Sequence, residues 1–423
     1  MDKKNTFKQI ISDFLDRELT SVYSREYDLP FNSNKIISVI GPRRAGKTHV
    51  LFNLIKELRN TLPNERLVYI NFEDDRLFPM RLEDMDIMIK GYYELYPDNK
   101  DHTVYFFLDE IQEVPNWEKF IRRIHDQENC RIYLTGSSSK MLSREIATAL
   151  RGRTITFEIF PLSFSEFLQF KGINVNPNTS KGEATLVHES WSYLRQGGFP
   201  ELIFSEPRFH KKIIEEYLDL MIYKDLTERF SIHNTYLIKY LLKHFLVNIA
   251  NPITITKTYN DLRSQGLKIS KNTVFEYTSH LEEAYLIFTA KLFTSSVRKQ
   301  AVNPTKIYGI DPAFKHAVSI SEDWGRLLEN MVYLHLRRKG ISPSYILSHQ
   351  EVDFYWEGGQ LINASIDVSN PSTYYREITG LISAMKSLGV NDGKVITMDY
   401  LEVYKERDIK IEFIPFWKFV FDL

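Results

Sequence analysis

Short apolar runs alternate with helical stretches over the first 160 residues of the chain. The runs consist mainly of β-branched, leucine and aromatic residues, at positions 36–40, 67–70, 104–108 and 132–134. Runs of this kind are typical of strands buried on both faces of a parallel sheet. Their alternation with helices predicts an α/β domain over residues 35–160, with helices on both faces of the sheet. Residues 1–34 form a lead-in, with an amphipathic helix expected at 6–18.

The pattern changes twice after residue 160. Residues 161–235 are mainly helical, with one break at 196–200. Residues 236–306 contain helical stretches, a turn at 261–266, a helix at 270–284 and a strand, an order that suggests a winged helix. Residues 307–423 contain a long helix at 324–338, several strands and a helix near 376–388, and they predict a separate small α/β unit.

Composition places the chain among ordinary globular proteins. Its 423 residues suffice for two to four domains, and no apolar run approaches the about 18–20 residues that a membrane span needs. The one cysteine, Cys130, excludes an intramolecular disulfide, and a reducing cytoplasm is the expected compartment. The net charge of −1 argues against an extensive nucleic-acid coat, although a local basic face is compatible with it.

A glycine-rich segment between the first predicted strand and the next helix has the pattern G-x-x-x-x-G-K-[ST]. Its glycines allow backbone N–H groups to wrap a phosphate, Lys47 would reach the β- and γ-phosphates, and Thr48 would hold Mg²⁺. The pattern predicts ATP and Mg²⁺ as ligands, and a glycine turn without a ligand is the alternative. The predicted nucleotide contacts are Gly41, Pro42, Arg43, Arg44, Ala45, Gly46, Lys47, Thr48 and His49.

Acidic residues follow a second buried strand, 104–108. We expect Asp109 to orient the Mg²⁺ shell and Glu110 to polarise the attacking water, which is what hydrolysis requires beyond binding. The next strand leads into hydroxyl-bearing residues, Thr135, Ser137 and Ser138. Thr135 is the candidate sensor of the γ-phosphate or of the water, and a helix N-cap is the alternative for any of the three hydroxyls.

Arg151 and Arg153 precede a predicted strand, after a helix expected at 143–150. A guanidinium at this position can neutralise transition-state charge, often on the nucleotide of a neighbouring subunit. Solvated surface arginines are the alternative. The acidic segment 73–75, near the carboxyl edge of the sheet, is predicted to be a solvated loop.

The combined motifs resemble a family of prokaryotic AAA-type ATPases from archaea and Bacteroides-like bacteria, in which the core is joined to a C-terminal domain of unknown function of the DUF4143 type. The resemblance implies an ATPase core, a helical lid at 161–235, a winged helix at 236–306 and a restriction-endonuclease-like domain at 307–423. The segments that carry it are 34–37 with the glycine-rich loop, 71–74, 108–112 with Trp117, 134–138, 150–153 and 197–200.

A restriction-type nuclease needs a helix glutamate, a strand aspartate, and a second acid and a lysine on the next strand. Glu329 and Asp353 match the first two, whereas Asn363 and Ser365 stand where the second acid and the lysine belong. The domain is therefore predicted to be a degenerate DNA-binding or structural fold. Period-2 alternation places Asp367 on the face of Asn363, so a shifted metal site is an alternative.

The predicted recognition helix of the winged helix begins with Ser270 as N-cap, followed by Lys271, Asn272 and Thr273. Residues 257–306 contain eight basic and four acidic side chains, a local net charge of +4 that suits DNA phosphates. Protein docking is the alternative. The sequence thus predicts a cytoplasmic, Mg²⁺-dependent ATPase that acts on DNA or a protein partner, with homo-oligomerisation possible and no membrane contact. A slow nucleotide switch and an ATP-dependent nuclease are the alternatives.

Overall fold

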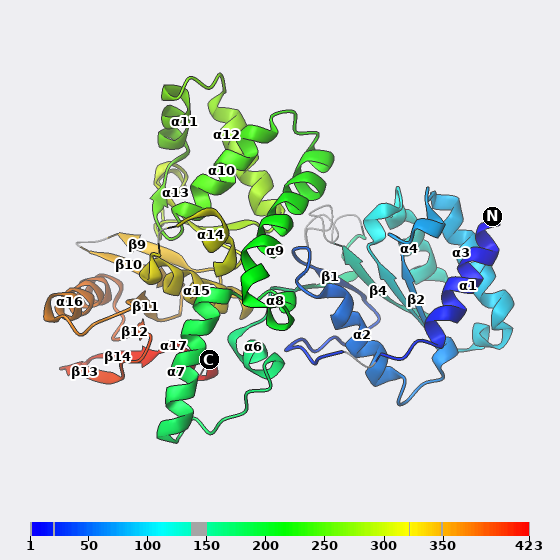
Figure 1. Ribbon diagram of the computed structural model, residues 1–423, viewed down its shortest axis with the longest axis horizontal. Helices are drawn as coiled ribbons and strands as arrows, with labels where there is room; N and C mark the ends of the chain where they lie inside the picture. The colour runs from blue at the N-terminus through cyan, green and yellow to red at the C-terminus, as the bar shows by residue number, and fades with distance from the viewer. Residues whose placement is uncertain (1, 20–21, 137–149, 321, 348–349, 423) are drawn as a thin grey trace. The chain divides into compact units, whose positions relative to one another are not determined.

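The computed structural model describes residues 2–19, 22–136, 150–320, 322–347 and 350–422 (Figure 1). Two compact units divide the chain, residues 1–159 and 160–423. Among the helices in the described ranges, none has both the length and the apolar content that crossing a membrane requires.

The first unit contains a five-stranded parallel sheet in the order β2-β3-β4-β1-β5. This confirms the parallel α/β architecture predicted from the buried apolar runs. The strands are β1 (Ile36–Ile40), β2 (Leu67–Asn71), β3 (Val104–Asp109), β4 (Cys130–Gly136) and β5 (Thr154–Glu158). Because β4 lies between β1 and β3, the carboxyl ends of these three strands meet at one edge.

Helices cover both faces of this sheet (Figure 1). The helices are α1 (Lys3–Leu15), α2 (Lys47–Leu58), α3 (Leu82–Leu95) and α4 (Trp117–Gln127). Tyr105 and Phe107 of β3 belong to the core with α1 and α2, whereas Phe106 points to the other face and contacts Tyr92 of α3. Helix α1 begins three residues before the predicted start because Asp2 caps it, its carboxylate accepting from the Lys4 N–H. The helix expected at 143–150 lies mostly outside the described residues.

The second unit begins with a helical region. Its elements are α6 (Phe164–Phe170), α7 (Ser180–Gln196), α8 (Pro200–Phe204), α9 (Pro207–Leu220), a π-helix (Met221–Glu228) and α10 (Thr235–Val247). The break between α7 and α8 requires glycine, since a Cβ on Gly197 would lie 1.9 Å from an Asp311 carboxylate oxygen. The Gly198 N–H donates to the other oxygen at 2.7 Å. Burial raises the pKa of Asp311 to about 6.

A helix-turn-helix and a small antiparallel sheet, in the order β6-β8-β7, come next. The elements are β6 (Pro252–Ile253), α11 (Ile255–Ser264), α12 (Lys271–Glu283), β7 (Ile287–Ala290), α13 (Val297–Val302) and β8 (Thr305–Gly309). The segment after β7 pairs with the strand that contains Tyr345, since the Phe293 N–H donates to the Tyr345 carbonyl at 2.8 Å and the Tyr345 N–H donates to the Lys291 carbonyl at 3.1 Å.

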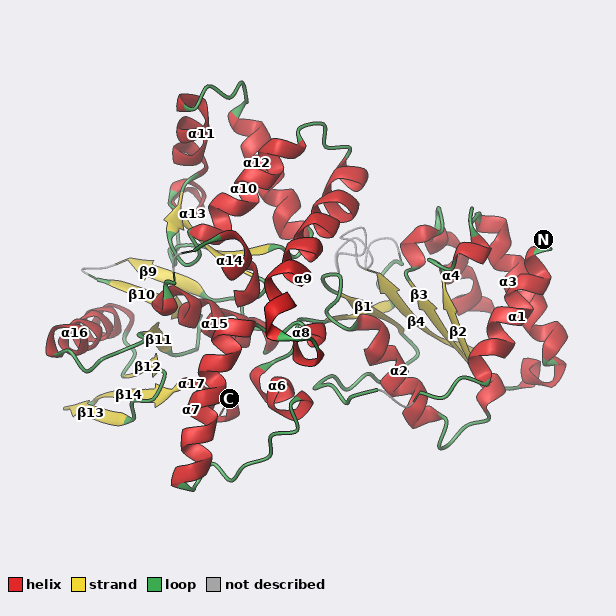
Figure 2. Ribbon diagram, in the orientation of Figure 1, coloured by secondary structure: helices red, strands yellow, loops and turns green. Residues whose placement is uncertain are grey.

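The remaining residues form a six-stranded mixed sheet in the order β13-β14-β12-β11-β10-β9, whose strands Figure 2 shows together. The elements are α14 (Pro312–Val318), α15 (Trp324–Arg338), β9 (Ser344–Leu347), β10 (Glu351–Tyr355), β11 (Leu361–Ala364), α16 (Pro371–Leu388), β12 (Asp392–Thr397), β13 (Glu402–Glu406), β14 (Ile409–Pro415) and α17 (Phe416–Asp422). Helix α15 has the predicted bounds. The division of residues 160–423 into a lid, a winged helix and a terminal domain stays a prediction.

Candidate functional site

The glycine-rich loop leaves β1 at Gly41, where only glycine fits. A Cβ there would lie 2.1 Å from the Ile159 carbonyl oxygen, and its φ is +146°. Further along the loop, Arg44 (φ +64°) and Gly46 (φ +97°) have left-handed backbone conformations, and α2 begins directly afterwards at Lys47. Such changes of backbone handedness before a helix N-terminus turn successive N–H groups toward one point, which is how proteins bind phosphate.

Cationic side chains hold this loop. The Lys47 ammonium is buried and donates to the carbonyls of Gly41 (3.1 Å) and Pro42 (2.9 Å). Arg25, from the lead-in, donates to the Ala45 carbonyl at 2.8 Å. Arg25 was not among the predicted site residues, because nothing in the lead-in sequence indicates contact with the loop.

The acidic segment 73–75 is tied to neighbouring arginines. Glu73 pairs with Arg43 of the loop at 3.2 Å, and Asp74 binds Arg76. The Asp74 carboxylate also caps the following 3₁₀ turn. These carboxylates therefore have structural partners, although Glu73 and Arg43 remain close to the loop.

Asp109 is the buried centre of the site, with 1% of its surface exposed. Its carboxylate accepts hydrogen bonds from Thr48 (2.8 Å), Tyr69 (2.7 Å) and Thr135. Burial and the nearby charge of Glu110 raise the pKa of Asp109, while the three hydroxyl donors lower it. Tyr69 was not predicted; its hydroxyl, within an otherwise apolar strand ending at the same edge, was the available signal.

Thr135 links Asp109 to the next residue. Its hydroxyl donates to Asp109 and accepts from the Glu110 N–H at 3.0 Å. Glu110 itself has a left-handed backbone (φ +52°, ψ +46°), which for a non-glycine residue costs about 1–2 kcal/mol. Its carboxylate accepts from Gln112 Nε2 at 2.6 Å. Local strain and directed hydrogen bonds of this kind are frequent where a side chain has to be held for chemistry.

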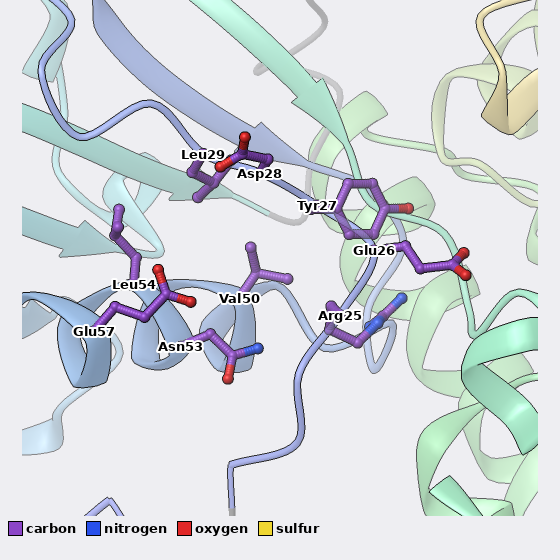
Figure 3. A pocket seen from close by; sticks show the side chains of 9 residues that line it. All are labelled: Arg25, Glu26, Tyr27, Asp28, Leu29, Val50, Asn53, Leu54 and Glu57. Carbon is purple, nitrogen blue, oxygen red and sulfur yellow. The ribbon is translucent and has the colours of Figure 1, made fainter. Parts of the chain in front are cut away.

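A cavity of about 350 Å³ lies between the lead-in and α2 (Figure 3). Helix α2 contributes one face, with residues at intervals of three and four, and Arg25 connects the cavity to the glycine-rich loop. The lining residues are Arg25, Glu26, Tyr27, Asp28, Leu29, Val50, Asn53, Leu54 and Glu57.

His49, one of the predicted nucleotide contacts, does not line this cavity. Burial and the charges of Arg25 and Arg17 lower the pKa of its imidazole.

The two candidate finger arginines lie at the opposite edge of the sheet. Thr154, which follows them, pairs with Ile36 at the start of β1, whereas the loop follows the end of β1. Five strand residues separate the two edges by about 16 Å. Arg153 forms two hydrogen bonds to Asp126, both of 3.0 Å, and Arg151 is exposed. Neither arginine can therefore reach the phosphate loop of its own subunit.

In the second unit, Glu329 and Asp353 do come together, on α15 and β10. They share the Lys306 ammonium, at 2.8 and 2.9 Å. Asn363 accepts from the Asp353 N–H at 3.1 Å and donates to Glu377 at 2.7 Å, so its amide bridges two acidic residues.

The expectation for Asp367 is wrong. Strand β11 ends at Ala364, and the chain bends at Ile366, so period-2 alternation no longer applies after that point. Ser365 is buried just beyond the strand, whereas Asp367 is exposed and accepts from the Ser369 N–H at 2.7 Å. Asp367 therefore does not replace a missing metal ligand.

The start of α12 has the predicted cap, with the Ser270 hydroxyl accepting from the Thr273 N–H at 3.0 Å. Lys271 and Asn272 are exposed. The local charge count needs a correction, because Lys306 is fully buried and cannot reach a phosphate of DNA. Ser137 and Ser138 lie outside the described residues.

Two family models match the chain. An AAA domain model matches residues 33–168, and a model described as a domain of unknown function (DUF8612) matches residues 188–323. The first covers the parallel sheet and its glycine-rich loop. The assignment of a DUF4143-type domain stays a prediction.

Solved structures resemble the chain only distantly. The Walker-type ATPase paby2304 of Pyrococcus abyssi has a TM-score of 0.43 and 14% identity, over 74% of this chain and 95% of that chain. The Aeropyrum pernix ORC2 protein has a TM-score of 0.38 and 14% identity, over 80% and 95% of the two chains.

Sequence identity to two other proteins is higher. A protein from Haemophilus influenzae is 28% identical over 77% of this chain and 80% of its own length. The protein MJ1544 of Methanocaldococcus jannaschii is 37% identical over 99% of this chain and 96% of its own length. The chain therefore belongs to the family of MJ1544, as a member with an AAA-type P-loop ATPase domain in its N-terminal part.

Proposed function

We propose that the chain is a Mg²⁺-dependent ATPase whose hydrolysis cycle controls an interaction of residues 236–423 with DNA or a protein partner. The observation that carries the proposal is the bonding of Asp109, which joins the start of α2 to Thr135 and, through it, to Glu110. In this scheme residues 161–235 serve as a helical lid.

The residues fit a nucleotide with its metal. Mg²⁺ prefers hard oxygen ligands, and the Thr48 hydroxyl and an Asp109 carboxylate oxygen lie 2.8 Å apart. When bound there, Mg²⁺ would neutralise charge on the β- and γ-phosphates. Lys47 and the loop N–H groups would hold the phosphates, and Glu110 would accept a proton from the attacking water. Thr135 would keep the backbone of Glu110 in place.

The cavity beside α2 is the proposed site for the base. It begins at Val50, one helical turn after Lys47, and it shares Arg25 with the phosphate loop. A purine at this position and phosphates at the loop would lie along the same helix. Carboxylates of Glu26 and Asp28 could accept from the exocyclic amine of adenine.

Steady-state phosphate release with ATP and Mg²⁺ tests the proposal. We expect turnover by the wild type, and we expect Lys47→Ala to weaken nucleotide affinity at least about tenfold because it removes the phosphate-binding ammonium. Nucleotide affinity is measured separately with a fluorescent ATP analogue. Tight binding without release of phosphate would support the slow switch and contradict the ATPase.

Arg151 is the better candidate for a finger that acts on a neighbouring subunit, because it is exposed while Arg153 is paired with Asp126. We expect Arg151→Ala to lower turnover at least about tenfold. Mixing it with Lys47→Ala subunits should restore activity, since one partner then supplies the arginine and the other an intact loop. Arg123→Ala, which alters an exposed arginine of the same unit, is the control. Failure of the mixture to recover would contradict action across an interface.

Residues 235–309 contain the elements α10-β6-α11-α12-β7-α13-β8, which match the order of a winged helix except that the short helix α13 lies between the last two strands. Four exposed basic residues surround its helix-turn-helix, and none of them forms an ion pair in the ranges that the structure describes: Lys257, Arg263, Lys268 and Lys271. Because Lys291 and Phe293 pair with Tyr345, the wing is engaged by the C-terminal sheet. We therefore propose that duplex DNA is contacted through α11 and α12 and not through the wing.

Four phosphate contacts predict a log–log slope of DNA affinity against salt of about −3.6. Lys271→Ala should weaken binding and make this slope less steep by about 0.9, because one contact is lost. Lys181→Ala, an exposed lysine of α7, should leave the slope unchanged. The slope is measured by fluorescence anisotropy with labelled duplex DNA between 50 and 200 mM salt. Over this roughly fourfold range of salt concentration, slopes of this size are resolved. A flat dependence in the wild type would favour a protein partner.

We further propose that residues 324–397 have the fold of restriction-type nucleases without their activity. The element order α15-β9-β10-β11-α16-β12 supports this proposal, together with Glu329 and Asp353 at the expected positions. Ser365 stands where the lysine of a restriction-type site belongs, and the absence of that lysine argues against hydrolysis of DNA.

A further inference from the structure

The carboxylates of this nuclease-like site surround one ammonium. Lys306 of β8 has a side chain that is 0% exposed, and its Nζ lies 2.8 Å from Glu329, 2.7 Å from Glu351 and 2.9 Å from Asp353. An ammonium has three N–H donors and no acceptor. Each donor therefore has one carboxylate partner, and none remains for substrate or water.

Two of the carboxylates accept a further hydrogen bond. The Glu329 oxygen that contacts Lys306 also accepts from the Tyr308 hydroxyl at 2.7 Å, and the other oxygen of Asp353 accepts from the Ala364 N–H at 2.9 Å. Burial lowers the pKa of Lys306, but the three carboxylates outweigh this effect and raise it above its ordinary value. The amine consequently stays charged and cannot act as a general base.

A divalent metal does not fit this arrangement. In a restriction-type site the metal would occupy the point where the carboxylate oxygens of Glu329 and Asp353 converge. Here Lys306 Nζ occupies that point, and the next strand offers the neutral Asn363 amide. With Lys306 in place, no group of three or more His, Cys, Asp or Glu side chains over the described residues is arranged to hold a metal ion.

We infer that Lys306 is the permanent cation of the Glu329–Glu351–Asp353 cluster, in the place where a related nuclease would bind its metal. Because Lys306 lies on β8, its ion pairs join the small antiparallel sheet to Glu329 on α15 and to Glu351 and Asp353 on β10. The nuclease-like site is thereby a buried junction between two parts of the second unit. This inference rests on the proposed nuclease-like fold and is independent of the ATPase.

Mn²⁺ binding, followed by electron paramagnetic resonance without nucleotide, tests the inference. All proteins carry Asp109→Asn, which removes the metal ligand of the first unit. We expect no ion bound at the cluster with Lys306 present. Lys306→Met should bind one Mn²⁺ at the cluster, with an affinity on the order of 100-fold above any residual affinity of the protein that keeps Lys306, because the three carboxylates lose their counter-charge. Adding Asp353→Asn to Lys306→Met should abolish that binding.

Lys315→Met is the matched control, since Lys315 is also a buried lysine but has no hydrogen-bond partner among the described residues. It should gain no Mn²⁺. The inference is overturned if the parent protein binds Mn²⁺ and Asp353→Asn removes the ion, or if folded Lys306→Met binds none. If Lys306→Met does not fold, Mn²⁺ binding by the parent and by Asp353→Asn still tests whether the cluster holds a metal while Lys306 is present. None of these outcomes depends on ATP turnover.

Discussion

Glu110→Gln is expected to lower ATP turnover about 1,000-fold while leaving nucleotide affinity unchanged. The amide keeps the size of the side chain but cannot take a proton from the attacking water. The backbone should be unaffected, because the Glu110 N–H bond to Thr135 does not involve the side chain. Phosphate release and binding of a fluorescent ATP analogue, both measured for the same preparation, separate the two effects.

Glu113→Gln is the control for this substitution. It makes the same chemical change three residues later, at the end of the same 3₁₀ turn, and should leave turnover within about twofold of the wild type, as surface changes usually do. Equal turnover of wild type and Glu110→Gln would mean that Glu110 is not the base. If that shared rate were also very slow, the protein would be a nucleotide switch and not an ATPase.

The parallel sheet was predictable because strands buried on both faces leave continuous apolar runs. The strand order was not, since β4 enters between β1 and β3 although it follows both in sequence. That order places Thr135 between the loop and Asp109. The predicted residues Lys47, Thr48, Asp109 and Glu110 all lie at this edge, as motifs with local spacing allow. Their roles stay predictions.

Contacts between segments that are distant in the chain could not be predicted from the sequence pattern. Tyr69 carries a hydroxyl within an apolar run, but the run does not specify that this hydroxyl binds Asp109. Lys306 was counted as part of a basic surface, because its burial depends on Glu329 and Asp353, which lie 23 and 47 residues away in the chain. Asp367 was misplaced for a local reason, the bend after β11.

Lys306→Met is expected to lower the free energy of unfolding of the second unit by about 3–5 kcal/mol. Methionine replaces the apolar stem of lysine and lacks only an atom at the position of Nζ, so the loss comes from the uncompensated charges of Glu329, Glu351 and Asp353 and not from lost packing of the stem. Burial and the charge of Asp353 already raise the pKa of Glu329 to about 8, even with the opposing effects of Lys306 and Tyr308. Removing the ammonium takes away the main opposing effect, so the pKa of Glu329 rises further and the ionised carboxylates of the cluster lose their buried counter-charge.

Lys315→Met should leave the free energy of unfolding of the second unit unchanged or raise it. Lys315 is 1% exposed, and burial lowers its pKa, so an apolar replacement removes a desolvated charge without breaking an ion pair. Urea unfolding followed by tryptophan fluorescence compares the two variants, because four of the five tryptophans, at 191, 324, 356 and 417, belong to the second unit. Equal losses for both variants would indicate that side-chain packing, and not the charge of Lys306, stabilises the junction. A selective loss at Lys306 would identify the ammonium as the group that joins β8 to α15 and β10.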